Sequence, residues 1–305
     1  MNPAVGVDIG GTKVSAALVS ADGTIGPVLR APTPARSGPD AVLDTVATLV
    51  TRLPGLGPVR GVGIGTAGLV RDGRIVSSTD TFSHWVGTDV AAGIRSRLPD
   101  ALGTRVRVCN DVNAHALGES WRGAGRDAAT ILMVAVGTGV GGAIVTRGRT
   151  WSGAHQVAGE IGHIPTPGAE KLRCPCGRLG HLEALAAGPA IAARYRDQGG
   201  HATSAREVVE RAGDGEQLAI NVVADAATGL GRALAGIITL LDPDRVVVGG
   251  GVAAAGSIWW DPLLDACRAE LVDAFTTIPI VPAQLGETAA LAGAARLVLD
   301  PIGTD

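Results

Sequence analysis

The chain has 305 residues, enough for one large domain or two ordinary ones, each with its own core. Its 46% hydrophobic and 18% charged residues are typical of a globular protein, and a net charge of −3 without runs of like charge argues against nucleic-acid binding. The first residues lack the features of a secretory signal, and the apolar stretch at 128–137 is far short of the roughly 20 residues that span a membrane. We therefore expect a cytoplasmic protein with no nucleic-acid and no membrane partner.

Strands and glycine turns alternate in the first half of the chain. Residues 4–30 predict a strand, a glycine turn, a strand, an Asp-Gly turn and a strand, because apolar β-branched runs are bounded by turn residues. The same order is expected at 59–78 and at 128–151. The first and third copies are alike enough to predict one hairpin used twice, in two similar halves that face each other across a cleft.

The remaining elements are mostly helical. A short strand ending at residue 110 leads into a helix that begins at Asp111, a favourable first residue. Helices are expected at 188–197, 205–214 and 217–243, then a strand at 244–248 and a closing helix from 288. Mixed strands and helices indicate an α/β protein.

Three glycine-rich stretches formally satisfy the dinucleotide pattern G-x-G-x-x-G/A, at 63–68, 137–142 and 249–254. A Rossmann site requires a helix after the glycines, and a strand is expected after the first two. Glycine turns inside hairpins can still cradle phosphates through backbone N–H groups. Asp8 suits Mg²⁺, usually through water, while Thr12 and Lys13 suit phosphate. The alternative is that these stretches are simply tight turns.

Six segments in a fixed order resemble the ROK family of sugar kinases. These segments are "DIGGTK", "NDVNAHALGE", "GTGVGGAIV", "GEIGH", "CPCGRLGHLE" and "VVVGGGVA". The resemblance covers nearly the whole chain and implies a two-lobed ribonuclease-H-like (actin-like ATPase) α/β fold with the active site in the interlobe cleft. The lobes would be residues 1–109, joined by the C-terminal helix 288–305, and residues 110–287.

The resemblance also implies Mg-ATP and a homodimer or homotetramer. The residues expected to contact the nucleotide are Asp8, Gly10, Gly11, Thr12, Lys13, Gly137, Thr138, Gly139, Gly249, Gly250 and Gly251.

Asp111 is the candidate catalytic base. Phosphoryl transfer to a hydroxyl needs a group that accepts the proton, and a carboxylate at a strand-to-helix junction is placed for that role. From the residues alone a helix N-cap is the better explanation, but the resemblance assigns the base to Asp111. The resemblance adds Asn110, Glu160, His163 and Glu183 as sugar-binding residues. The alternative for the two glutamates is solvent-facing charge, and His115 is expected on ordinary helix surface.

Cysteine and histidine spacing predicts a metal site in the loop 163–183. Cys174, Cys176, His181 and His163 offer two thiolates and two imidazoles, a set that suits tetrahedral Zn²⁺. Four protein ligands leave no position for water, so the zinc would be structural and would order the sugar pocket. Relatives usually carry a third cysteine where this chain has His181. The alternative is a pair of buried thiols in a turn.

Glucose is the expected substrate, with transfer of the γ-phosphate to its 6-hydroxyl. N-acetylmannosamine or N-acetylglucosamine is the alternative, because two segments depart from the family near the expected sugar. The asparagine usual before Trp85 is missing, with Thr79, Asp80 or Thr81 as substitutes, and Gln156 stands where relatives often have glycine. A sugar-sensing regulator without catalysis is a remote alternative.

Overall fold

The computed structural model describes residues 2–78, 81–103 and 105–299, and these form two compact units. Unit 1 comprises Met1–Ala129, Ile144–Ala158 and Gln284–Asp305, and unit 2 comprises the rest of the chain. The units differ from the predicted lobes at 110–129, 144–158 and 284–287, so the lobe boundaries remain a prediction. Thr79 and Asp80 lie outside the described residues, as does the end of the predicted helix 288–305.

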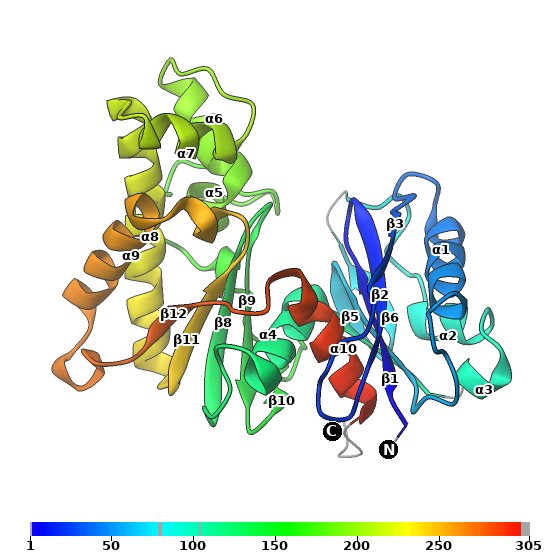
Figure 1. Cartoon of the computed structure of the whole chain (residues 1–305). Helices are drawn as coiled ribbons and strands as arrows, with labels where there is room; N and C mark the ends of the chain where they lie inside the picture. The colour runs from blue at the N-terminus through cyan, green and yellow to red at the C-terminus, as the bar shows by residue number, and fades with distance from the viewer. Residues whose placement is uncertain (1, 79–80, 104, 300–305) are drawn as a thin grey trace. The chain divides into compact units, whose positions relative to one another are not determined.

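Unit 1 is built on a five-stranded sheet (Figure 1). From edge to edge its strands are β3 (Leu29–Pro32), β2 (Lys13–Val19), β1 (Ala4–Ile9), β4 (Val62–Thr66) and β7 (Val106–Asn110). β1 runs antiparallel to β2 and parallel to β4, and β4 runs parallel to β7. The carboxyl ends of β1, β4 and β7 therefore lie at one edge of the sheet, where ligands bind in open α/β sheets.

Residues 59–78 contain three strands separated by turns, in the predicted order, but these strands do not pair with one another as the strands of the first copy do. β5 (Leu69–Arg71) and β6 (Arg74–Ser77) pair with each other in a separate two-stranded sheet. β4 lies between β1 and β7, because its all-buried residues suit the centre of a parallel sheet.

Helices cover both faces of the unit 1 sheet (Figure 1). They are α1 (Pro39–Thr51), α2 (Val90–Arg95), α3 (Asp100–Gly103), α4 (Asp111–Arg122) and α10 (Ala289–Leu299), with the short 3-10 helix η4 (Gly286–Thr288) before α10. α10 packs against β1, β4 and α4. A Cβ at Gly63 would overlap the carbonyl oxygen of Ala294, and one at Gly293 would overlap that of Ala114. These glycines allow the backbones to approach closely, which is a packing role and not a nucleotide-binding one.

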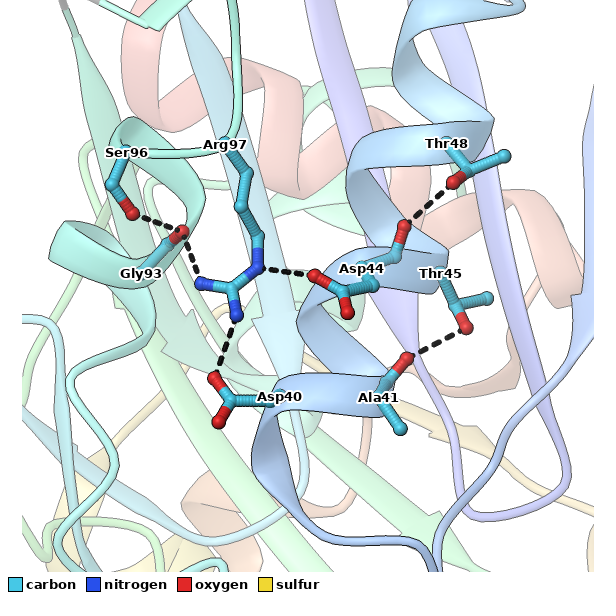
Figure 2. Close-up of polar contacts among 8 residues, drawn as sticks. All are labelled: Asp40, Ala41, Asp44, Thr45, Thr48, Gly93, Ser96 and Arg97. Carbon is cyan, nitrogen blue, oxygen red and sulfur yellow. Dashed lines mark hydrogen bonds and ion pairs between the residues drawn. The ribbon is translucent and has the colours of Figure 1, made fainter.

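Arg97 fastens α2 to α1, as Figure 2 shows. Its Nε donates to Asp44 and its Nη2 to Asp40, both at 2.6 Å, while Nη1 donates to the carbonyl of Gly93 at 3.0 Å. The planar guanidinium suits this forked arrangement, so the apolar face of α1 is held against the sheet core.

The strands of unit 2 belong to a second five-stranded sheet. Its order is β10 (Arg149–Thr150), β9 (Val140–Thr146), β8 (Thr130–Val136), β11 (Arg245–Gly249) and β12 (Ile280–Pro282), and the division between the units passes through β9. In chain order this is third, second, first, fourth, fifth, which is also the order of the unit 1 sheet. The prediction of one hairpin used twice, at 4–30 and at 128–151, is therefore confirmed.

The helices of unit 2 follow the predicted segments. They are α5 (Glu183–Ala186), α6 (Gly188–Asp197), α7 (Ala205–Gly213), α8 (Gln217–Leu241) and α9 (Ser257–Glu270), with 3-10 turns η1 (Ile161–His163), η2 (Val252–Ala255) and η3 (Asp273–Phe275). Among the described residues, α8 is long and apolar enough to cross a membrane by length and composition alone. Because 56% of its most apolar window is buried within the structure and it packs against α9, it matches a core helix equally well.

Candidate functional site

The first glycine turn joins β1 to β2 in unit 1. The N–H of Gly10 donates to the carbonyl of Lys13 at 3.0 Å, and Thr33 fixes the turn from β3 by donating its hydroxyl to the Gly10 carbonyl at 2.7 Å. A Cβ at Gly11 would lie 2.6 Å from the Cγ2 of Thr81, so Thr81 borders the turn. The predicted nucleotide residues 10–13 thus form one rigid turn at the carboxyl end of β1.

Asp111 begins α4 directly after β7. The N-cap is Asn110, whose Oδ1 accepts from the N–H groups of Val112 and Asn113, while its Nδ2 donates to the carbonyl of Gly68 at 3.1 Å. The capping explanation for Asp111 is therefore not needed, because its neighbour performs that function. One oxygen of Asp111 accepts from Val112 N–H at 2.9 Å, which orients the carboxylate at the helix start.

Asp8 and Asp111 lie at the same edge of the sheet. Asp8 pairs with Gly65 on β4, and Gly65 pairs with Cys109 on β7, so the two carboxylates stand two strands apart, roughly 10 Å between backbones. Burial raises the pKa of Asp8 to about 6, and the Asp111 carboxylate adds to the rise. A carboxyl group whose charged form is disfavoured by burial is a favourable place for a cation.

His115 is a residue that the sequence interpretation missed. Its Nδ1 lies 3.0 Å from the carbonyl oxygen of Asp111, so the Nδ1–H form donates there. Among the charged neighbours of Asp8, His115 lowers the pKa of that group most. The expectation of ordinary helix surface was wrong, because one helical turn carries residue 115 back to the face that bears Asp111.

The second glycine turn joins β8 to β9 in unit 2. The N–H of Gly137 donates to the Gly139 carbonyl at 2.9 Å, which closes the turn around Thr138. The Glu183 Oε2 accepts from Val140 N–H at 3.0 Å, so α5 is fastened to this turn. Glu183 is partly buried and makes a backbone contact. The sequence predicted a sugar contact for this residue, with solvent-facing charge as the alternative.

The third glycine cluster lies beside the second turn. Gly249 pairs with Ala135 on β8, and a Cβ at Gly250 would overlap the backbone of Val136, the residue before the turn. Gly250 also has a φ of 95°, which favours glycine. The predicted nucleotide residues 137–139 and 249–251 are thus brought together within unit 2.

The four predicted metal ligands form one cluster. Their ligand atoms all lie within 4.8 Å of one another. The Cys174 Sγ is 3.7 Å from His163 Nδ1, and the Cys176 Sγ is 3.2 Å from His181 Nδ1. Two thiolates and two imidazoles that converge on one point fit tetrahedral Zn²⁺, so a histidine at 181 meets the geometry that a cysteine would.

Glu160 lies beside this cluster. Its Oε2 lies 4.0 Å from His163 Nε2, while the Nδ1 of the same ring faces Cys174. Ligating histidines commonly direct their second nitrogen to a carboxylate, which fixes the ring. Burial raises the pKa of Cys174 to about 11, whereas the N–H of Arg178 lowers the pKa of Cys176, so a cation would be needed to hold both as thiolates.

The segment 151–158 contains Gln156, where the family resemblance led us to expect glycine. Gln156 has a φ of 60°, a left-handed conformation that glycine adopts without strain. This explains why glycine suits the position.

A model of the ROK family matches residues 4–301. The chain belongs to the ROK family. The glucokinase of Thermotoga maritima is 31% identical over 98% of this chain and 98% of that protein. An N-acetylmannosamine kinase of Escherichia coli is 33% identical over 95% of this chain and 96% of that protein.

The solved structures agree with this assignment. The ROK family glucokinase of Streptomyces griseus, in complex with glucose and AMPPNP, is similar at a TM-score of 0.80 and 30% identity, over 97% of this chain and 98% of that one. The fold of this ROK protein is therefore the actin-like ATPase fold of the sugar kinases, as the resemblance predicted.

Proposed function

We propose that this ROK protein is an ATP-dependent hexose kinase that transfers the γ-phosphoryl group to the 6-hydroxyl of glucose. Glucokinases are relatives over nearly the full length of the chain. The observation that carries the mechanism is the pair of Asp8 and Asp111 at one sheet edge, beside the glycine turn that joins β1 to β2.

In this mechanism Asp111 accepts the proton of the sugar hydroxyl. Capping by Asn110 leaves the second carboxylate oxygen of Asp111 for that hydroxyl, and the Val112 N–H holds the first. Mg²⁺, when bound with ATP, neutralises the charge of the phosphates. Asp8 would hold it, because release of a proton from its raised-pKa carboxyl group is favoured by a cation. Lys13 and the turn N–H groups would orient the phosphates.

The metal cluster supports the sugar-binding segments in this proposal. Zinc at the four ligands would hold the segment of Glu160 against the segment of Glu183, and Glu183 in turn fastens the second glycine turn. We propose that both glutamates also face sugar hydroxyls, since ionised carboxylates accept several hydrogen bonds. We further propose a cytoplasmic homodimer or homotetramer, which light scattering would test.

The proposal is tested by ADP release with Mg-ATP and a panel of glucose, mannose, fructose, N-acetylmannosamine and N-acetylglucosamine. We expect the highest kcat/KM with glucose and about one zinc per chain, lost in Cys176→Ser. Equal or higher kcat/KM with N-acetylmannosamine would support the second candidate, which the Escherichia coli relative favours. Absence of turnover with every sugar would contradict both.

A further inference from the structure

Glu287 lies against the lysine that is expected to bind phosphate. It belongs to η4, and its Oε1 lies 2.5 Å from the Nζ of Lys13, 274 residues away in the chain. Its Oε2 lies 3.5 Å from Nη2 of Arg30. The carboxylate of Glu287 thus forms ion pairs with both Lys13 and Arg30.

The sheet sets up this arrangement. Ser15 on β2 is the partner of Arg30 on β3, and Lys13 is two residues before Ser15, so Lys13 and Arg30 project from the same face. The η4 turn brings Glu287 to that face, and all three side chains are partly exposed, at 40% for Lys13, 47% for Arg30 and 64% for Glu287. The hydrogen bond from Lys13 lowers the pKa of Glu287, so this carboxylate is charged at neutral pH.

An exposed ion pair of this kind is weak, with a typical value of about 0.2–1 kcal/mol. A polyanion such as a nucleotide phosphate chain can therefore displace it. Until it is displaced, Lys13 is neutralised and a negative charge stands where phosphates would approach the ammonium.

We propose that Glu287 competes with the phosphates of Mg-ATP for Lys13, and that this latch must open for the nucleotide to bind. The inference rests on the proposed function, since it takes Lys13 as a phosphate contact. Arg30 holds the released carboxylate, because it is the second cation within reach of Glu287. The residue thus limits nucleotide affinity without touching the sugar.

The test compares Glu287→Gln with the wild type by calorimetric titration of Mg-AMPPNP, which is not hydrolysed. Glutamine keeps the size and loses the charge, so we expect a Kd about 1.5- to 5-fold lower, converted from the value of an exposed pair, and a smaller difference at high salt. Glu270→Gln is the matched control, because Glu270 also forms an exposed pair, with Arg232 at 3.7 Å, and its Kd should equal that of the wild type. An unchanged or higher Kd in Glu287→Gln would overturn the proposal.

A double variant separates the latch from simple repulsion. In a Lys13→Met background the Glu287→Gln change should alter the Kd less than 1.5-fold, because no ammonium remains to compete for. If Glu287→Gln lowers the Kd in that background as much as in the wild type, the proposed competition for Lys13 is wrong. These titrations need no turnover, so their outcome is independent of the sugar assay, where absence of turnover by the wild type would instead contradict the proposed kinase function.

Discussion

The β1–β2 turn and the β8–β9 turn occupy the same place in two sheets of the same strand order. A glutamate contacts each turn, but one contacts a side chain and the other a backbone N–H group. Lys13 and Val140 follow the two turns at matching positions. Glu287 reaches the exposed side chain of Lys13, whereas Glu183 accepts from the backbone N–H of Val140. A side-chain ion pair in water exchanges easily, and a partly buried backbone contact holds a turn in shape.

The acidic residue before the turn also differs. Asp8 has its equivalent at Ala135 in unit 2, so only the first of these two turns carries a carboxylate at that position. The two turns thus differ in their surroundings: Asp8 and the Lys13–Glu287 ion pair lie at the first turn, whereas the second is held by Glu183, two residues after His181 of the cysteine and histidine cluster.

Glycine substitutions in the two sheets should have very different effects on stability. Gly63→Ala would place a Cβ onto the Ala294 carbonyl, and helix backbone cannot move aside cheaply. We expect a loss of about 3 kcal/mol or more in the free energy of unfolding, measured by urea denaturation. At Gly137 an added Cβ meets no described atom within 4 Å, so Gly137→Ala should cost less than about 1 kcal/mol. Equal losses of unfolding free energy in the two variants would contradict this difference in packing.

Glu119 provides the next test, as a carboxylate that holds a loop in unit 1. It is fully buried and accepts from the N–H groups of Ala124, Gln284 and Leu285. Glu119→Ala removes the acceptor of the Gln284 and Leu285 N–H groups and should lower the free energy of unfolding by about 3 kcal/mol. Glu183→Ala removes one such acceptor from Val140 and should cost about 1 kcal/mol. A larger loss for Glu183→Ala would reverse the ranking.

Asp8 makes the stability of unit 1 depend on pH. Burial raises the folded-state pKa of Asp8 from 3.8 to about 6. The stabilisation of the folded state by this group is therefore complete below about pH 3.8 and is lost as the pH rises through 6. Asp8→Asn should therefore be more stable than the wild type at pH 8, by about 1–2 kcal/mol after allowance for partial exposure, and the gain should shrink towards pH 4.5.

Asp22→Asn is the opposite control for that measurement. The N–H of Thr24 lowers the pKa of Asp22, so its contribution is present above pH 3.8 and lost in acid. That variant should be no more stable than the wild type at pH 8. A gain of the same sign in both variants would indicate a general charge effect instead of burial of Asp8.

Substitution of Gln156 should have the smallest effect on stability, and here glycine is introduced instead of removed. Its left-handed backbone suits glycine, so Gln156→Gly should raise the free energy of unfolding by about 0.5–1 kcal/mol, offset in part by greater freedom of the unfolded chain. Gln156→Ala keeps the strain and should give no gain. Equal effects of the two changes on thermal unfolding would contradict a backbone origin.

The sequence predicted what depends on local spacing. The duplicated hairpin, the start of α4 at Asp111 and the convergence of Cys174, Cys176 and two histidines were all expected, because turn residues and ligand spacing are visible in short windows.

The contacts that sequence reasoning missed join segments far apart in the chain. Glu119 meets Leu285 across 166 residues, and Lys13 meets Glu287 across 274. His115 was missed for another reason, since a lone histidine on a helix gives no signal until the neighbouring strand is placed. The separate β5–β6 sheet was missed because a strand-turn-strand pattern does not specify which strand becomes the partner.

The most direct test of the proposed chemistry at the first turn is the turnover of Asp111→Asn. Asparagine keeps the size of the side chain and removes its ability to accept a proton. We predict that kcat at saturating glucose and Mg-ATP falls by about 10²–10⁴-fold, while the Kd for Mg-AMPPNP stays within 2-fold of the wild type. A variant that retains kcat within a few-fold would contradict the assignment of Asp111 as the base.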